Sequence, residues 1–240
     1  GTDFHGWQRQ ESDRTIQGEL ERVLGVLEGR EVGIIGSGRT DAGVHAEGQV
    51  ANVVLSKNFT AEKLRAAING NLWRDIRIMN VEYAPDEFHA RFSAKKKTYI
   101  YRIVNAPVMS PFWRRFALHE SNPLDVNAMR SASRLLLGEH DWTAFSAAQS
   151  DAENRVRNVI DCGFETLWDD RAGAMLIEFR ITANGFLRYM VRSIVGTLLE
   201  VGLGTRDSDT IQTAMVNGDR TLAGRTAPPQ GLCLHRVEYD

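Results

Sequence analysis

A ten-residue segment concentrates the residues that could do chemistry. It reads Gly36-Ser37-Gly38-Arg39-Thr40-Asp41-Ala42-Gly43-Val44-His45 and follows the short apolar run Val32–Ile35. Glycines allow positive φ angles and let a ligand approach the backbone closely. An aspartate with an arginine two residues before it is expected to be ionised at neutral pH, which suits a nucleophile or an electrostatic stabiliser better than a general acid. Asp41 is therefore the first candidate for a catalytic group.

Three common explanations of a glycine-rich loop do not fit this segment. The Gly-Lys-Ser/Thr of a phosphate-binding loop is absent, and Ser37 does not stand in a Gly-x-Ser-x-Gly nucleophile elbow. No helical pattern opens directly after the glycines, as a dinucleotide-binding fold requires. The plainest alternative is an Asx-turn, in which Asp41 caps its own backbone. The spacing alone leaves that alternative open.

The basic residues are unevenly distributed, although the net charge is only −2. No acidic residue occurs between Arg91 and Arg115, or from Arg180 to Leu199, whereas residues 1–30 lean acidic. This segregation favours a basic face that binds nucleic acid, and a solvated charged surface is the alternative.

Hydrophobic periodicity predicts the elements that must position these residues. It predicts helices over Thr15–Leu27, from a Thr60 cap to Leu72, from an Asp125 cap to Leu136, over Phe186–Val201 and, in a short form, over Thr210–Met215. Strands are predicted at Val32–Ile35, Val50–Leu55, Ile76–Val81, Thr98–Val104, Met175–Ile181 and Leu232–Val237. Because side chains alternate along a strand, Tyr99, Tyr101 and Ile103 share one face.

Strands interleaved with two helices in each half predict an α/β (α+β) fold. The basic run Lys95-Lys96-Lys97 is the predicted seam between two units, 1–94 and 95–240, with no flexible linker. A chain of 240 residues, 42% of them apolar and 25% charged, is long enough to bury a core without disulfide bonds.

Composition also bounds the compartment and the cofactors. Cys162 and Cys233 lie far apart and form no Cys-x-x-Cys pair, and the histidines lack metal-binding spacing, so we expect free thiols and no metal. No apolar run approaches the roughly 18 residues of a membrane span, and the N-terminus lacks a secretory signal pattern. We therefore expect a cytoplasmic protein.

Five blocks of the sequence, in order along the chain, resemble the tRNA pseudouridine synthase A (TruA) family. They are 1–10 (GTDFHGWQRQ), 38–46 (GRTDAGVHA), 88–94 with 97–101 (FHARFSA and KTYIY), 184–192 (NGFLRYMVR) and 231–234 (GLCL). One block could arise by chance, whereas five in family order span essentially the whole chain. The family places a strand ahead of the first Gly-Thr, and this sequence starts at Gly1, so we expect a central strand of the first sheet to be absent.

The resemblance implies two similar subdomains with mixed or antiparallel sheets flanked by helices, and an active cleft between them. It implies an isomerase that converts uridine to pseudouridine at positions 38, 39 and 40 in the anticodon stem-loop of tRNA, without cofactor or metal. In that reaction the N-glycosidic bond breaks, the uracil rotates and a C–C bond forms. It also implies a homodimer whose joint surface holds one tRNA.

The same resemblance gives roles to five residues. Asp41 matches the catalytic carboxylate, which adds covalently to the substrate or supports the separated sugar. Tyr99 matches the tyrosine that packs on the flipped uracil and could help to move its C5 proton, and Arg39 matches an arginine that assists base extrusion or holds phosphate. Arg192 matches an arginine that pairs with Asp41, and Leu232 matches a wall of the uracil pocket.

Plainer interpretations of single residues stay open at this point. Tyr99 and Leu232 could be core residues, Arg188 could be a solvated helix residue, and Trp7 could contact RNA or pack beneath the loop. Two other functions compete with the isomerase. One is a catalytically silent RNA-binding module, and the other is a glycoside-type hydrolase, which usually needs two carboxylates about 5 to 10 Å apart.

Overall fold

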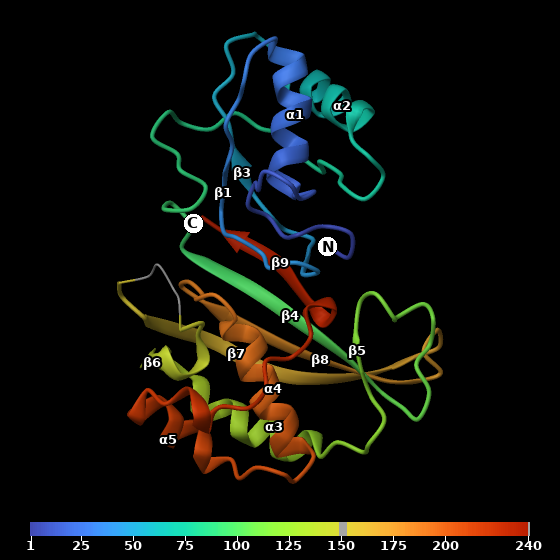
Figure 1. The fold of residues 1–240 in the computed structure, drawn as a ribbon, viewed down its shortest axis with the longest axis vertical. Coiled ribbons are helices and arrows are strands. Elements are labelled where there is room, and N and C mark those ends of the chain that lie inside the picture. The colour runs from blue at the N-terminus through green and yellow to red at the C-terminus, as the bar shows by residue number, and fades with distance from the viewer. Residues whose placement is uncertain (149–152, 240) are drawn as a thin grey trace.

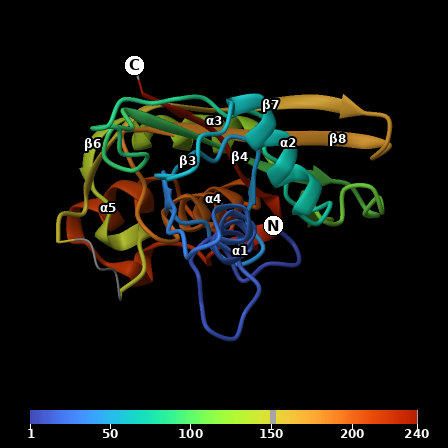
Figure 2. The ribbon, with the colours of Figure 1, turned by 90° about the horizontal axis from the view of Figure 1, so that it is seen from above.

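The computed structural model describes residues 1–148 and 153–239. Figure 1 shows three layers along the long axis of the molecule. Helices α1 (Ile16–Glu28) and α2 (Ala61–Asn71) lie at one end, the long strands cross the middle, and helices α3 (Val126–Ser133), α4 (Met190–Gly202) and α5 (Asp209–Asn217) lie at the other end. Seen from above, the long strands run together along one side, with α4 and α5 beside them (Figure 2). No helix in the described ranges is long and apolar enough to cross a membrane.

Within the described residues, seven strands form the larger sheet, in the order β2-β9-β4-β8-β7-β6, with β5 beside β4. Their bounds are β2 (His45–Ala46), β4 (Lys96–Asn105), β5 (Leu118–Glu120), β6 (Gly138–Asp141), β7 (Val156–Asp169), β8 (Ala174–Ala183) and β9 (Leu232–Glu238). The pairs β2–β9 and β4–β5 are parallel and the other pairs are antiparallel. The mixed sheet with flanking helices confirms the predicted fold class.

The N-terminal region has little regular strand structure. Its own sheet consists of β1 (Ile35–Gly36) and β3 (Ala51–Asn52), which pair antiparallel. Its third strand, β2, joins the larger sheet, because His45 pairs with Cys233 of β9. The boundary between residues 94 and 95 stays a prediction.

Two large hydrophobic cores and one small cluster (Val104, Ala117, Ala174 and Leu176) occur among the described residues. The larger core joins the sheet to α3, α4 and α5, and its fully buried side chains include Tyr101, Trp142, Phe145 and Phe179. The second core lies between α1, α2 and the N-terminal segment, and it is built on Phe4, Trp7, Val23, Leu24 and Ile68, among others. Each core stabilises the region whose helices cover it, since burial of apolar area is the main favourable term in folding.

The predicted helices are confirmed, with local differences at their ends. Thr15, Thr60 and Asp125 cap α1, α2 and α3 through their side-chain oxygens. The helix expected from Phe186 begins only at Met190, because Tyr189 has a left-handed backbone with φ of 65°. Short 3₁₀ turns complete the fold at Arg134–Leu136, Thr143–Phe145, Arg220–Leu222 and Pro229–Gly231.

Three strand predictions need correction. The strand expected at Ile76–Val81 is absent from this described segment, where the Asn69 amide satisfies both backbone groups of Ile78. The strands expected at Val32–Ile35 and Val50–Leu55 shrink to the two-residue strands β1 and β3. The longest strand, β7, was missed because a register shift between Val159 and Asp161 breaks its alternation of buried and exposed side chains.

Candidate active site

The segment that carries Asp41 is a loop held by backbone hydrogen bonds from the N-terminal segment. The Trp7 amide donates to the Thr40 carbonyl at 3.0 Å, and the Gly43 amide donates to the Phe4 carbonyl at 3.3 Å. Within the loop, the Val44 amide donates to the Asp41 carbonyl at 3.1 Å. These bonds fix the backbone on both sides of Asp41.

Close packing of Trp7 under the loop explains why position 36 requires a glycine. A Cβ at Gly36 would lie 2.4 Å from Cζ2 of Trp7, and the Trp7 side chain is buried with 4% of the residue exposed. Of the two interpretations left open for Trp7, the structure supports packing beneath the loop. At Gly6, which has φ of 89°, a Cβ would lie 2.5 Å from the Thr40 carbonyl oxygen. The loop and the N-terminal segment therefore pack backbone to backbone.

Asp41 faces two arginines, Arg192 in the first turn of α4 and Arg188 just before the helix. Its Oδ2 lies 3.0 Å from Nη1 of Arg192, and its Oδ1 lies 4.0 Å from Nε of Arg188. The Arg192 side chain is 13% exposed, and its Nε also donates to the Ala227 carbonyl at 2.8 Å, so it is held on both sides. The Arg188 side chain is 59% exposed. The structure thus brings Arg192 against Asp41, and leaves Arg188 as a solvated second cation.

Tyr189 lies between these arginines and was not identified from the sequence. Its ring centroid is 4.8 Å from Cζ of Arg188 and 5.1 Å from Cζ of Arg192, so both guanidinium groups pack on the ring. It is also the one non-glycine residue with positive φ in the described residues. Such backbone conformations cost free energy and cluster at functional sites. No spacing rule in the sequence signals this conformation.

Tyr99 lies on β4 inside the larger core, with 8% of the residue exposed. Burial raises the pKa of its phenol, and the negative charge of Asp41 raises it further. Its ring meets the ring of Phe186 edge to face, with 5.0 Å between the centroids. The phenol is therefore neutral at physiological pH, and close enough to Asp41 to sense its charge.

Leu232 and Arg39 differ in exposure to solvent. Leu232, the first residue of β9, is a buried member of the same core as Tyr99. Arg39 is exposed in the loop, two residues before Asp41. Arg39 lies in the Asp41 loop itself, and Leu232 follows Pro229, whose Cγ would lie 3.0 Å from a Cβ at Gly43 of that loop. The substrate roles that the resemblance implies for Tyr99, Leu232 and Arg39 stay predictions.

Lys97 is a further residue that the sequence interpretation missed. Its Nζ donates to the Ser37 carbonyl. The Ser37 hydroxyl donates to Oε1 of Gln49 at 2.6 Å, and Nε2 of Gln49 donates to the Gly38 carbonyl at 2.9 Å. Burial, with the nearby charges of Arg91 and Arg157, lowers the pKa of Lys97 to about 8. Its place two residues before Tyr99, on the same face of the strand, was the available signal.

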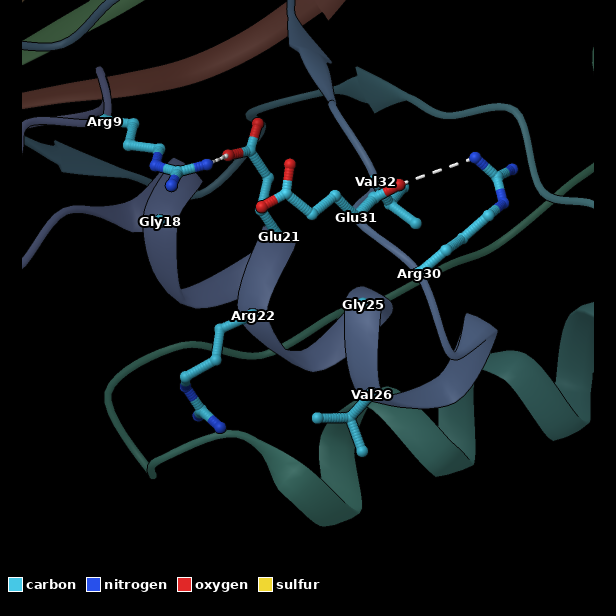
Figure 3. A pocket seen from close by; sticks show the side chains of 9 residues that line it. All are labelled: Arg9, Gly18, Glu21, Arg22, Gly25, Val26, Arg30, Glu31 and Val32. Carbon is cyan, nitrogen blue, oxygen red and sulfur yellow. Dashed lines mark hydrogen bonds and ion pairs between the residues drawn. The ribbon is translucent and has the colours of Figure 1, made fainter.

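A surface hollow of about 510 Å³ lies along α1, away from these residues (Figure 3). Its lining residues are Arg9, Gly18, Glu21, Arg22, Gly25, Val26, Arg30, Glu31 and Val32. Nη1 of Arg9 pairs with Oε2 of Glu21 at 3.3 Å across one end. None of the candidate site residues lines it. Across residues 1–148 and 153–239, no cluster of three or more His, Cys, Asp or Glu side chains is arranged to hold a metal ion.

Comparison with known proteins gives the class of this fold and site. A family model described as tRNA pseudouridine synthase matches residues 1–93 and 132–240. Among curated relatives, the tRNA pseudouridine synthase A of Geobacillus sp. (strain WCH70) is 46% identical over 241 residues, covering 100% of this chain and 95% of that protein. The proteins of the same name from Bacillus sp. (strain KSM-64) and Thermoanaerobacter sp. (strain X514) are 44% and 43% identical, with coverage of 100% of this chain and 96% of each relative.

The chain belongs to the tRNA pseudouridine synthase family, whose members are isomerases. The resemblance seen in the five sequence blocks is thereby confirmed.

Proposed function

We propose that this chain isomerises uridine to pseudouridine at positions 38, 39 and 40 in the anticodon stem-loop of tRNA, with Asp41 as the catalytic carboxylate. Family membership supports the reaction class. The observation that carries the assignment of Asp41 is its ion pair with the largely buried Arg192, at 3.0 Å. The charge of Asp41 also reaches the phenol of Tyr99, where burial and this charge both raise the pKa. A carboxylate held in this way keeps its charge and direction when water leaves the site.

In the proposed reaction the bond between uracil N1 and the ribose C1′ breaks, the uracil turns over, and a bond forms between C5 and C1′. The C5 proton is then lost, and N1 carries a proton instead, so the atoms balance without an added reactant. Asp41 either adds to the substrate covalently or stabilises the separated sugar. Tyr99 supplies a ring on which the base can pack, and Leu232 forms the wall of its pocket.

The base must leave the stem-loop before it can reach Asp41, and flipping costs a few kcal/mol. Arg39, exposed beside Asp41, is proposed to grip the RNA backbone or to support the extruded base. Arg188, also exposed, offers a second cation at the same place. Because phosphate contacts carry most of the affinity, we expect tRNA binding to weaken steeply with added salt.

Two further proposals concern the setting of the reaction. We propose that two copies of the chain form a homodimer whose joint surface holds one tRNA, and that the protein acts in the cytoplasm. Both rest on the resemblance to the family. Sedimentation of the protein with and without tRNA tests the first proposal, with one tRNA per two chains as the expected stoichiometry.

The direct experiment is incubation with unmodified tRNA, followed by mapping of pseudouridine at each position, with Asp41→Ala alongside. We expect pseudouridine at positions 38 to 40 with the wild type and none above background with the variant. Equal yields would show that Asp41 is not catalytic. No modification by either protein, with tRNA binding intact, would favour a silent RNA-binding module. Free uracil among the products would favour a hydrolase.

A further inference from the structure

Three cationic side chains outside the Asp41 cluster converge at one end of the larger sheet. Lys97 stands opposite Ala183 on β8, and Ala183 stands opposite Val159 on β7, so these residues form one row across three strands. Arg157 precedes Val159 by two residues, and alternation along the strand therefore places Lys97, Arg157 and Tyr99 on the same face of the sheet.

Arg91 reaches the same end of the sheet from a turn before β4. The preceding residue, Ala90, accepts a hydrogen bond from the Tyr239 hydroxyl at 2.9 Å, and its amide donates to Oδ1 of Asn52 at 2.9 Å. Tyr239 directly follows β9, whose Glu238 pairs with Lys96. The turn that carries Arg91 is thus tied to the strand ends next to Lys97.

The three side chains are close enough to affect each other's charge. Burial lowers the pKa of Lys97 and of Arg157, and nearby positive charges lower it further: those of Arg91 and Arg157 at Lys97, and that of Arg91 at Arg157. In the part of the chain that the structure describes, none of the three forms an ion pair with a carboxylate. Lys97 and Arg157 donate to backbone carbonyls instead, and Arg91 packs on the Phe92 ring. Like charges gathered without a counterion favour an anionic ligand.

Two glycines let these cations lie close to the backbone. A Cβ at Gly38 would lie 3.3 Å from Nζ of Lys97, and a Cβ at Gly185 would lie 3.2 Å from Nε of Arg157. Gly185 directly precedes Phe186, whose ring meets Tyr99. The cluster is therefore adjacent to the ring on which the uracil is proposed to pack.

We propose that Arg91, Lys97 and Arg157 form a binding site for a phosphate of the RNA backbone next to the flipped nucleotide. The ligand class is a phosphodiester, recognised by charge-assisted hydrogen bonds. That this phosphate belongs to the tRNA substrate rests on the proposed function. The cluster borders the loop that carries Arg39, because Lys97 donates to the Ser37 carbonyl, and it adds cations that neither Arg39 nor Arg188 supplies.

A consequence of this geometry is proton uptake when RNA binds. Lys97 has a pKa of about 8 in the free protein, and a bound phosphate favours its charged form. Affinity for RNA should therefore fall as the pH rises from 7.5 to 9.5, because free Lys97 then loses its proton. Arg91 and Arg157 are the charged groups beside it, and burial raises the pKa of the neighbouring Tyr239 to about 12, so its phenol stays neutral in this range.

The test measures binding of an unmodified anticodon stem-loop RNA, by fluorescence anisotropy, from 50 to 200 mM salt. We expect Lys97→Met to weaken binding by about tenfold and to reduce the salt slope by about 0.7 to 0.9, the loss of one phosphate contact. The matched control is Arg180→Gln, which removes a cation from the opposite face of β8, and it should change binding less than threefold. Equal effects of Lys97→Met and Arg180→Gln would overturn the site.

Further variants keep the test decisive if Lys97→Met does not fold. Lys97→Arg should bind RNA like the wild type and lose the decline in affinity above pH 8, and Arg157→Gln should weaken binding about as much as Lys97→Met. A wild-type affinity that does not change with pH would contradict the role of Lys97. Free inorganic phosphate is the other possible ligand, so its binding to the wild type and to the variants is measured as well. If the variants bind inorganic phosphate more weakly but bind RNA as tightly as the wild type, the RNA assignment is refuted.

Failure of this site and failure of the proposed function can be told apart. RNA binding with the expected salt and pH dependence, but no pseudouridine, would refute the isomerase and keep the phosphate site. If the wild type forms pseudouridine and both Lys97→Met and Arg157→Gln bind RNA as tightly as the wild type, the phosphate site is refuted and the isomerase is kept.

Discussion

Two regions of the molecule, the larger sheet and the N-terminal region, hold their backbones in different ways. Strands β4, β7, β8 and β9 contain 10, 14, 10 and 7 residues and form a continuous ladder. Strands β1, β2 and β3 contain two residues each. The loop with Asp41 belongs to the N-terminal region with its short strands, whereas Tyr99 and Arg192 belong to the larger sheet and the helices packed on it.

The difference teaches how the candidate site is positioned. Tyr99 is fixed by hydrogen bonds along a long strand, and Arg192 by a helix packed in the larger core. Asp41 lies in a loop that is held by a few backbone hydrogen bonds to the N-terminal segment and by the side chains of Trp7, Gln49 and Arg192. Sites are most precise when regular elements fix their residues. Changes to those supporting side chains should therefore disturb the reaction more than similar changes elsewhere on the surface.

The largest effect is expected where the helix meets the loop. Arg192→Met leaves the partly buried Asp41 without its closest cation, so we expect turnover to fall by about 10²-fold and stability by about 2 kcal/mol or more. Single-turnover kinetics and urea unfolding measure the two losses.

Arg188→Met is the matched control, because Arg188 lies 4.0 Å from the same carboxylate but is mostly exposed. Its effect on stability should stay below about 1 kcal/mol. Equal destabilisation by the two variants would show that the buried ion pair does not hold the loop.

A smaller effect is expected beneath the loop. Gly36→Ala places a methyl group 2.4 Å from Cζ2 of the buried Trp7, and overpacking of this kind costs about 1 to 3 kcal/mol. Gly33→Ala, three residues earlier, meets no atom within 4 Å and should be close to neutral. Thermal unfolding compares them. If Gly36→Ala were as stable as Gly33→Ala, the loop would not rest on Trp7.

The smallest effect on the reaction is expected far from the site, at the end of α1. The buried Glu28 carboxylate accepts hydrogen bonds from the Ser56 hydroxyl and amide and from the Lys57 amide, which lower its pKa from 4.5 to about 2. Since the folded pKa lies below the unfolded value, this stabilisation is complete above about pH 4.5 and is lost as the pH falls towards 2.

Urea midpoints between pH 3 and 6 measure this dependence. Glu28→Gln should flatten the slope, and the exposed neighbour Glu31→Gln should leave it unchanged. A slope unaffected by Glu28→Gln would mean that other carboxylates cause the acid sensitivity of this region.

Secondary structure was predicted best where the residues that define an element all lie within that element. Caps at Thr60 and Asp125 with helical apolar spacing located α2 and α3, and Tyr99 fell on its strand as predicted. Hydrophobic periodicity alone missed β7, because a bulge interrupts its alternation of buried and exposed side chains. It also predicted a strand at Ile76–Val81, where apolar residues face the second core without pairing to another strand. Secondary structure depends there on partners distant in the sequence.

The same limit applies to the site. The loop glycines and Asp41 stand together in the sequence, so a functional loop could be predicted from them. The contact between Asp41 and Arg192 joins residues 151 positions apart, and only the resemblance implied it. Tyr189 was missed because its left-handed backbone arises from packing, which local spacing does not encode. The burial of the Lys97 amine also arises from packing, and only its place on the Tyr99 face of the strand could be predicted from spacing.

The measurement that tests the central claim most directly compares Asp41→Asn with the wild type in two assays on the same tRNA. The account predicts that pseudouridine formation falls by roughly 10³-fold or more, while the dissociation constant for tRNA changes only a few-fold. Substantial turnover by Asp41→Asn, or a loss of tRNA binding as large as the loss of turnover, would contradict the assignment of Asp41 as the catalytic group.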